Sequence, residues 1–355
     1  MSIESLRPRD FMQLAMQGAI ILDVRSPGEF HHGHIPGACS FPLFSDQERA
    51  EVGTLYKQQG RQTAVLRGLE IVGPKMRSFV EQAQILHQQC PHLPLLVHCW
   101  RGGMRSGSMA WLLATAGIPV KVMRGGYKAY RNYIRSEFSK PAKVLVLGGL
   151  TGSGKTAILQ QLAVWGLQVL DLEGLANHKG SAFGPLGQPE QPTTEQFENN
   201  CFAIWQNFDL DRLILLEGES PNIGKVRINE ELLEKMKTAD LLIVELEREL
   251  RLDRIMQEYG QFGLEDLMNT SQKIEKKLGG QNLKEVLKLL QENQVRQAGS
   301  ILLDYYDRTY WHSLKKKGTQ WLDHLILKSS SVDENAKVVL HRINTFLLGK
   351  GDKDE

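Results

Sequence analysis

Cys99 has the most distinctive chemical surroundings in this sequence. An apolar run, PLLVHCW, ends at Trp100 and leads into the turn WRGGMRS. Glycines let a backbone curl so that successive N–H groups point inward, and a helix after the turn adds positive potential. Such a loop stabilises a thiolate and binds an anion beside it. The predicted anion cradle consists of Arg101, Gly102, Gly103, Arg105 and Ser106.

Two reactions fit this loop. His98 and Cys99, followed after five residues by Arg105, match the HC-x5-R pattern of cysteine phosphatases. The same loop suits a sulfurtransferase, in which the thiolate accepts a sulfane atom and carries it as a persulfide. The other cysteines have no such context, and no two cysteines have C-x-x-C spacing. Neither a zinc site nor a disulfide framework is therefore predicted.

A second motif, GGLTGSGKT at 148–156, contains the P-loop pattern G-x-x-x-x-G-K-T. That pattern needs a strand before it and a helix after it, and the flanking runs KVLVLGG and AILQQLAVWG fit both. The backbone N–H groups would wrap a diphosphate, Lys155 would neutralise its charge and Thr156 would ligate Mg²⁺. The predicted phosphate-binding residues are Gly149, Gly152, Ser153, Gly154, Lys155 and Thr156.

Charged residues farther along the chain are candidates for the metal and the lid of this site. The run LILLEGES carries Glu217 and Glu219 where an aspartate is commoner. Glu217 is the predicted second Mg²⁺ ligand, and the alternative is a pair of strand-end carboxylates without a metal. Arg248, Arg251 and Arg254 either close over the phosphates or form a solvated face.

The loop DLEGLANHKGSAFG, at 171–184, follows the expected second strand of the P-loop half, where related folds place substrate loops. Its glycines and polar side chains indicate ligand contact, and the alternative is an ordinary surface loop. The predicted substrate contacts are Asp171, Glu173, His178 and Ser181.

Both motifs need βα alternation to position them. Apolar runs alternate with helical patterns, which favours parallel sheets covered by helices. In the first half, strands are predicted at 19–25, 94–100 and 120–126, with a helix at 108–117 and a less regular surface insertion at 46–74. In the second half, strands are predicted at 143–149, 167–174, 211–220 and 239–247. Helical periods prevail from Arg248 onward, and no further strand is predicted there.

A chain of 355 residues is too long for one ordinary core and indicates two domains. The predicted divisions are a first domain at 1–138, a linker at 139–142, a P-loop domain with a helical C-terminal section at 143–350 and a disordered tail at 351–355. The net charge of +2 and the 41% hydrophobic content are typical of soluble proteins. Because the sequence has neither a bilayer-spanning run nor a signal-peptide layout, we expect a cytoplasmic protein without a membrane partner.

The segment ILDVRSPGEFHHGHIPGA, at 21–38, resembles the signature of the rhodanese superfamily, which includes sulfurtransferases and phosphatases. The ordered segments DVRSPGEF, VGTLYKQQG, CWRGGMRS, GGYKAYR, GGLTGSGKT and DLEGLANHKGSAFG closely resemble bacterial tRNA 2-selenouridine synthases. The resemblance runs from about Ala19 to the C-terminal helices and is looser in the last third. It implies an α/β fold: a rhodanese-like parallel-sheet domain, followed by a P-loop NTPase-like α/β domain with a helical C-terminal section.

This resemblance implies a transferase that acts on the wobble uridine, U34, in the anticodon loop of tRNAs for Lys, Glu and Gln. The family replaces the sulfur of 2-thiouridine by selenium from selenophosphate, and it transfers a geranyl group from geranyl diphosphate to that sulfur. Cys99 matches the family's reactive cysteine and would carry selenium as a perselenide. The P-loop would bind the diphosphate of geranyl diphosphate together with Mg²⁺. A monomer that receives selenophosphate from a supplying enzyme is expected.

A tRNA partner needs a basic surface, and the segment 121–143 is mostly basic with interleaved tyrosines. Such side chains contact phosphates and stack on unpaired bases. The candidate tRNA contacts are Lys121, Arg124, Tyr127, Lys128 and Arg131. The alternative is a polar linker whose tyrosines pack on the domains. Lys315, Lys316 and Lys317 form a second candidate phosphate contact.

Two other functions stay open. A rhodanese-fold cysteine phosphatase or sulfurtransferase fused to a small-molecule kinase would phosphorylate its substrate with ATP. A catalytically silent rhodanese domain that regulates a P-loop NTPase would tolerate Cys99→Ser without any change in chemistry.

Overall fold

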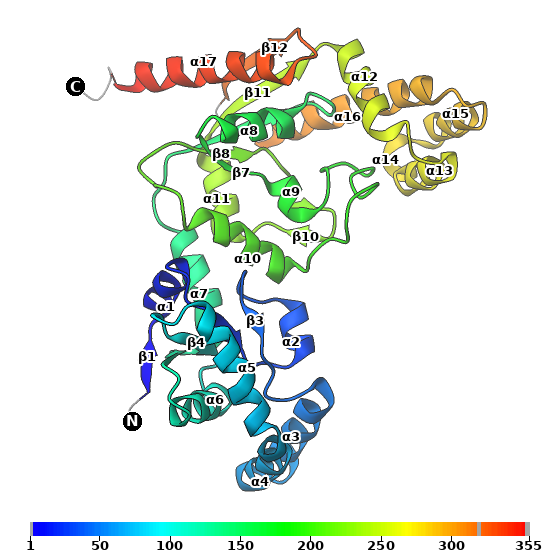
Figure 1. Ribbon diagram of the computed structural model, residues 1–355. Coiled ribbons are helices and arrows are strands. Elements are labelled where there is room, and N and C mark those ends of the chain that lie inside the picture. Colours follow the sequence, from blue (N-terminus) through cyan, green and yellow to red (C-terminus); the bar gives the residue numbers. More distant parts are fainter. Residues whose placement is uncertain (1–2, 318–320, 352–355) are drawn as a thin grey trace. The chain divides into compact units, whose positions relative to one another are not determined.

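The computed structural model describes residues 3–317 and 321–351 (Figure 1). The chain divides into two compact units, Met1–Phe138 and Ser139–Glu355. Apart from Gly351, the predicted tail at 351–355 lies outside the described residues. No helix in the described part of the chain is long and apolar enough to cross a membrane.

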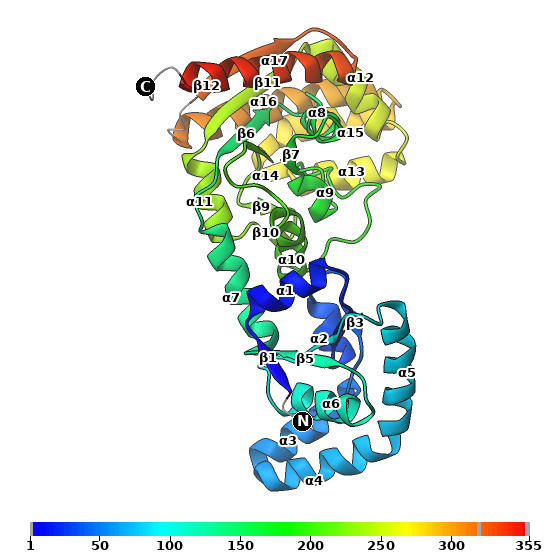
Figure 2. The same cartoon turned by 60° about the vertical axis from the view of Figure 1, so that its left-hand side comes forward.

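The first unit is built on a sheet of five parallel strands. They are β1 (Glu4–Leu6), β2 (Ile21–Asp23), β3 (Cys39–Ser40), β4 (Leu95–His98) and β5 (Val120–Met123), in the spatial order β1-β5-β4-β2-β3. The predicted strands around 19–25, 94–100 and 120–126 are confirmed. β1 and β3 were not predicted, because such short strands carry little periodic signal. In Figure 2, β1 lies beside β5.

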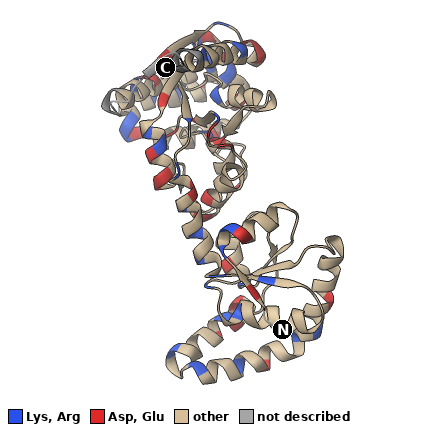
Figure 3. Ribbon diagram, turned by 90° about the vertical axis from the view of Figure 1, so that its left-hand side faces the viewer, with Lys and Arg blue, Asp and Glu red and all other residues tan. Residues whose placement is uncertain are grey.

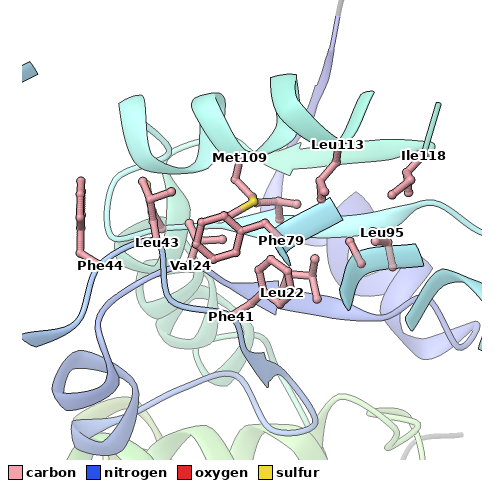
Figure 4. Packing of buried hydrophobic residues seen from close by; sticks show 13 residues of the cluster. Leu22, Val24, Phe41, Leu43, Phe44, Phe79, Leu95, Met109, Leu113 and Ile118 are labelled. Atoms are coloured by element: carbon pink, nitrogen blue, oxygen red, sulfur yellow. The ribbon is translucent and has the colours of Figure 1, made fainter. Parts of the chain in front are cut away.

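Helices cover this sheet and bury its apolar residues. They include α1 (Pro8–Met16), α2 (Pro27–His32), α5 (Met76–Gln89), α6 (Met104–Thr115) and α7 (Gly126–Phe138). Met109 and Leu113 of α6 point toward Phe79 of α5 and toward strand residues such as Leu22 (Figure 4). All four side chains are at most 8% exposed. The sheet therefore holds β4, which ends just before Cys99, in a rigid core.

The stretch predicted as a less regular insertion is helical. It forms α3 (Asp46–Gln58), α4 (Arg61–Val72) and a short 3₁₀ helix (Gly73–Lys75). Ser45 and Glu48 form a capping box that begins α3. Leu66 and Leu69 of α4 are more than half exposed, and this exposure weakens the apolar periodicity by which helices are recognised.

The second unit holds another sheet of five parallel strands. They are β6 (Val144–Gly149), β7 (Gln168–Leu170), β8 (Ile214–Glu217), β11 (Asp240–Leu246) and β12 (Trp321–Leu327), in the order β12-β11-β6-β8-β7. The four strands predicted in this half are confirmed. β12 corrects the prediction that no strand follows Arg248. It is an edge strand with polar residues inside it, and such a strand lacks the continuous apolar run of a central parallel strand.

The helices of the second unit are α8 (Lys155–Val164), α9 (Leu172–Ala176), α10 (Thr194–Trp205), α11 (Glu230–Thr238), α12 (Arg248–Tyr259), α13 (Leu264–Lys273), α14 (Glu275–Leu278), α15 (Gly280–Gln291), α16 (Val295–Lys317) and α17 (Val332–Gly351). A small antiparallel pair, β9 (Asn222–Ile223) and β10 (Val226–Arg227), lies between β8 and α11 in the chain. Helices α13, α14 and α15 gather at one end of α16 (Figure 1). The predicted α/β class with a helical C-terminal section is confirmed.

Candidate functional site

Cys99 directly follows the last residue of β4 and is only 3% exposed. Its Sγ is 3.2 Å from the hydroxyl oxygen of Ser106, in the first turn of α6. That hydroxyl also donates to the carbonyl of Gly103 at 3.2 Å. The predicted loop thus brings Cys99 and Ser106 together at the N-terminus of a helix, where an anion is favoured.

The Cys99 loop rests against the start of α7. The backbone N–H of Tyr127 donates to the carbonyl of Cys99 at 2.8 Å, and the N–H of Lys128 donates to the carbonyl of Trp100 at 3.0 Å. Gly102 has φ +64°, and a Cβ there would lie 2.7 Å from the carbonyl of Met123. Gly126, with φ +60°, would clash with the same loop if it carried a Cβ. Gly126 was not among the predicted site residues, although the pair Gly-Gly after β5 is the signal of such a close backbone approach.

Arg105 is held by Glu29, which was not among the predicted site residues either. Its two terminal nitrogens donate to the carboxylate of Glu29 at 2.5 and 3.2 Å. Burial alone would raise the pKa of Glu29, but Arg105 outweighs it and holds that pKa below its ordinary value. Arg101, by contrast, is exposed. Glu29 therefore orients one cation of the predicted cradle while the other points to solvent.

Behind the loop lies a buried cluster of polar and aromatic groups. Arg25 donates to the carboxylate of Asp23 at 2.6 Å and stacks 3.8 Å above the ring of Tyr127. His98 is fully buried, and burial lowers its pKa to about 4 despite the nearby Asp23 carboxylate. His98 is thus a neutral residue of the core beneath Cys99.

Tyr127 corrects one predicted tRNA contact. Its side chain is fully buried between Arg25 and the ring of Tyr130, so it cannot stack on a tRNA base in this structure. The packing alternative holds for this tyrosine.

The four cationic candidates remain predictions. Arg124 and Lys128 are exposed, Arg131 is partly buried, and Lys121 pairs with Glu4 at 2.9 Å. The side chains of Lys315, Lys316 and Lys317 lie outside the described residues. Basic and acidic residues are interspersed along the helices of both units (Figure 3).

In the second unit, the P-loop connects β6 to α8 as predicted. Gly152 and Gly154 adopt φ +77° and +78°, which curls the loop ahead of Lys155, the first residue of α8. The Lys155 ammonium donates to the carbonyl of Gly149 at 3.3 Å. The hydroxyl of Ser153 is buried and has no hydrogen-bond partner among the described residues. A turn of this kind presents backbone N–H groups to an anion.

The three arginines that were considered as a lid contact different parts of the second unit. Arg251 is buried, pairs with Asp307 through two 2.7 Å hydrogen bonds and also donates to the carbonyl of Thr151. Arg251 therefore braces the P-loop from behind, which neither prediction anticipated. Arg254 lies directly against Gly154, so its guanidinium is beside the P-loop. Arg248 pairs with Asp304, away from that loop.

Three carboxylates meet beside the P-loop. The hydroxyl of Thr156 donates to Glu217 at 2.7 Å and to Glu173 at 3.1 Å. Carboxylate oxygens of Glu173, Glu217 and Glu219 lie within 4.8 Å of one another. Thr156 and Glu217, the predicted metal ligands, are thus adjacent. The contribution of Glu173 was missed, because 44 residues separate it from Glu217 and only the fold unites them.

This cluster brings three carboxyl groups close to one ammonium group, that of Lys155. Burial, and after it the neighbouring Glu173 carboxylate, raise the pKa of Glu217 to about 8. Burial also raises the pKa of Glu173 to about 8, although Lys155 opposes this shift. For Lys155, burial alone would lower the pKa, but the three carboxylates together raise it. Carboxylate and hydroxyl oxygens are the ligands that Mg²⁺ prefers, so the residues present fit such an ion.

Of the four predicted substrate-loop residues, only Glu173 joins this cluster. Asp171 caps α9 by accepting from the N–H of Gly174 at 2.8 Å. His178 is buried, and burial lowers its pKa. Ser181 accepts from the N–H of Phe183 at 3.2 Å. Asp171 therefore shapes the loop, whereas Ser181 lies near the helical section.

Comparisons with known proteins agree with this arrangement. Residues 8–133 match the rhodanese-like domain family, and residues 142–329 match the family described as tRNA 2-selenouridine synthase AAA domain. A protein named tRNA 2-selenouridine synthase from Shewanella sp. (strain MR-7) is 32% identical over 354 residues, covering 89% of this chain and 94% of its own. A protein of the same name from Sulfurovum sp. (strain NBC37-1) is 32% identical, covering 88% of this chain and 93% of its own. Another, from Nitrosomonas europaea, is 36% identical and covers 70% of this chain and 66% of its own.

Proposed function

Because the chain belongs to the tRNA 2-selenouridine synthase family, and is therefore a tRNA-modifying transferase, we propose that it works in two steps at two sites. The P-loop site transfers a geranyl group from geranyl diphosphate to the sulfur of wobble 2-thiouridine. The Cys99 site then replaces the S-geranyl group by selenium from selenophosphate. The proposed substrates are tRNAs for Lys, Glu and Gln, and we propose a cytoplasmic monomer that receives selenophosphate from a supplying enzyme.

In the first step, the thione sulfur attacks C1 of the geranyl group, the C1–O bond breaks and diphosphate leaves with the bonding electrons. Lys155, Arg254 and the N–H groups of the P-loop would bind the diphosphate and oppose its growing charge. Thr156 and Glu217 would hold Mg²⁺, which when bound offsets the charge of the leaving group.

In the second step, Cys99 would act as a thiolate nucleophile, because a perselenide formed from the selenide-level selenium of selenophosphate would need an oxidant that the reaction does not supply. Ser106 and the N-terminus of α6 would hold this anion, and Arg105, oriented by Glu29, would supply a positive charge. The Cys99 thiolate attacks C2 of the uridine, the C2–S bond to the geranylthio group breaks and geranylthiolate leaves. The selenium of selenophosphate then attacks C2 and releases the Cys99 thiolate, and water cleaves the Se–P bond to give phosphate and 2-selenouridine. An S-alkylated sulfur leaves more readily than a thione, which is the reason for the first step.

The observation that carries this proposal is the pairing of a buried Cys99 loop with a P-loop whose Lys155 faces three carboxylates. The test is nucleoside mass spectrometry after incubation with 2-thiouridine tRNA, geranyl diphosphate and selenophosphate. Lys155→Ala is expected to abolish S-geranylation, because the departing diphosphate loses its main cation. Cys99→Ser is expected to abolish selenation and to accumulate S-geranyl-2-thiouridine.

The competing functions give other results in the same variants. A phosphatase fused to a kinase would hydrolyse an aryl phosphate through Cys99 and transfer phosphate from ATP, without either modified nucleoside. A silent rhodanese domain would leave selenation intact in Cys99→Ser. If the wild-type protein formed neither S-geranyl nor 2-seleno nucleosides, the proposed function would be wrong.

A further inference from the structure

Helices α3 and α4 form a hairpin that the sheet of the first unit does not need. They lie in the chain between β3 and β4, and the 14 residues of α5 are enough for the crossover between these parallel strands. Figures 1 and 2 show α3 and α4 side by side at one end of the first unit. Neither the Cys99 loop nor the P-loop accounts for both helices, which indicates that the hairpin has a role of its own.

The apolar core holds the base of this hairpin. Val52 of α3 and Ile71 of α4 pack against the buried cluster of the first unit. At the other end, only Gln59 and Gly60 connect the two helices, and Gly60 has φ +89°, which suits a tight turn. The hairpin therefore has a fixed base and an outer end that faces solvent.

The outer end, residues 56–62, which we call the hairpin tip, consists of seven successive exposed residues. Its sequence, YKQQGRQ, contains two cations, three amides and one aromatic ring, and it has no acid. Tyr56 is 53% exposed, so its ring is accessible from solvent. Neither Lys57 nor Arg61 forms an ion pair with any residue that the structure describes. Such a combination suits a ligand that carries both negative charge and flat rings.

Neighbouring cations on the same segment are already paired. Arg67, on the body of α4, lies 2.6 Å from the carboxylate of Glu51, and Lys75 lies 2.6 Å from that of Glu48. The tip cations have no such partner. No side chain caps the N-terminus of α4 at Gly60, so its first N–H groups add to the positive potential of the tip.

The opposite end of α3 lies beside the Cys99 site. Arg49, in the first turn of α3, is 3.8 Å from Glu29, which holds Arg105 at the Cys99 loop. Nine residues further, α3 ends at Gln58, about 14 Å along its axis. That length equals about four nucleotides of a stacked strand, at roughly 3.4 Å each. An RNA that reaches Cys99 is therefore long enough to contact the hairpin tip as well.

We propose that the hairpin tip binds the tRNA close to the uridine that is modified at Cys99. Lys57 and Arg61 contact phosphates, and Tyr56 stacks on an unpaired base. This inference rests on the proposed function in that it places the uridine at Cys99, but tRNA binding by the tip can be measured without either reaction. An acidic protein would also attract the two cations, but it offers the ring of Tyr56 no base on which to stack.

The first test measures the affinity for fluorescently labelled 2-thiouridine tRNA by anisotropy over a range of salt concentrations. Lys57→Ala/Arg61→Ala is expected to weaken binding about tenfold at low salt and to make the plot of log Kd against log salt shallower by about 1.4, because two phosphate contacts are lost. Arg7→Ala/Arg77→Ala is the matched control. It removes the same charge from exposed positions of the same unit, but each of these arginines is paired with an acid, so the wild-type slope should remain.

The second test concerns the aromatic ring. Tyr56→Ala is expected to weaken tRNA binding about tenfold without changing the salt slope, because stacking releases no counterions. Tyr56→Phe keeps the ring and should bind as the wild type does. In selenation of S-geranyl tRNA, Tyr56→Ala should raise KM and leave kcat nearly unchanged, whereas a disturbance of the Cys99 loop would lower kcat.

The outcomes separate this inference from the proposed function. If Lys57→Ala/Arg61→Ala kept the wild-type affinity and salt slope, the assignment of the tip to tRNA would be overturned, and an acidic protein would be the next candidate partner. If the wild-type protein bound tRNA through the tip but formed neither modified nucleoside, the proposed function would fail and the binding surface would stand. If the wild-type protein bound no tRNA, both would be wrong.

Discussion

The residues around Cys99 and Lys155 come from neighbouring and from distant positions of the chain. Cys99 and Lys155 are identified by neighbours within a few positions, where spacing alone defines a loop. Glu29 contacts Arg105 across 76 positions of sequence, and Arg254 reaches Gly154 only after α12 has folded back. A carboxylate or guanidinium has no sequence feature that reveals such a partner.

His98 leads to a prediction about acid stability. Its pKa in the folded protein is about 4, below the ordinary 6.5, so between these values the unfolded chain binds a proton that the folded chain excludes. The contribution of His98 is therefore fully present above pH 6.5 and is lost as the pH falls toward 4. The shift corresponds to roughly 3 kcal/mol at the acid end.

Hydrogen exchange of a peptide covering β4 (Leu95–His98) measures this effect in the first unit. We expect protection in the wild type to fall between pH 6.5 and pH 4, and we expect His98→Gln to show a flatter dependence. Acidic residues titrate in both proteins, so the difference between the two curves isolates His98. Parallel curves would contradict the buried neutral state.

At the scale of helices and strands, the elements predicted from the sequence are those whose residues are mostly buried. The central strands of both sheets are buried on both faces, which makes them continuous apolar runs. β12 instead carries polar residues that find partners in space: His324 lies 2.9 Å from the carboxylate of Glu245, and Asp323 pairs with Arg342. Such a pattern is not apolar enough to indicate a strand. Helices α3 and α4 were missed for the same reason, because much of their surface faces solvent.

The junction of the Cys99 loop with α7 gives a second prediction. Gly126→Ala would place a Cβ against the carbonyl of Cys99 and the N–H of Gly102. Backbone atoms cannot give way as a side chain can, so the loop must shift and selenation of S-geranyl tRNA should fall by at least about tenfold. S-geranylation, which we propose to take place in the other unit, should persist.

Gly117→Ala is the matched control for this change. Gly117 also has positive φ, at +81°, but a Cβ there would meet no atom within 4 Å. In both variants the alanine must adopt a positive φ, which lowers the free energy of unfolding by about 1 kcal/mol. Only Gly126→Ala adds the clash with the Cys99 loop. Equal selenation rates in the two variants would show that the contact with α7 does not position Cys99.

At the scale of the whole molecule, each unit supplies by itself all the residues that we have described at its own site. The residues placed around Cys99 all precede Ser139, and the residues placed around Lys155 all follow it. Each unit also has its own apolar core, built on its own parallel sheet. Sequence motifs predicted this separation because each motif needs its own strand and helix.

This separation leads to a prediction about mixtures of variants. Cys99→Ser should retain S-geranylation, and Lys155→Ala should retain selenation of S-geranyl tRNA, because neither substitution touches the other site. A mixture of the two variants should therefore convert 2-thiouridine to 2-selenouridine, with S-geranyl-2-thiouridine appearing first. Nucleoside mass spectrometry over time measures both species.

The rate of 2-selenouridine formation in this mixture should also depend on protein concentration. Transfer of S-geranyl tRNA from one molecule to another is bimolecular, so the rate in the mixture should rise with the concentration of Lys155→Ala protein, whereas the wild-type rate per molecule should not. The double variant Cys99→Ser/Lys155→Ala, added in place of either partner, controls for simple tRNA binding and should give no 2-selenouridine. A mixture that accumulated S-geranyl-2-thiouridine but never formed 2-selenouridine would mean that the intermediate stays on the chain that made it, and that the two sites must belong to one molecule.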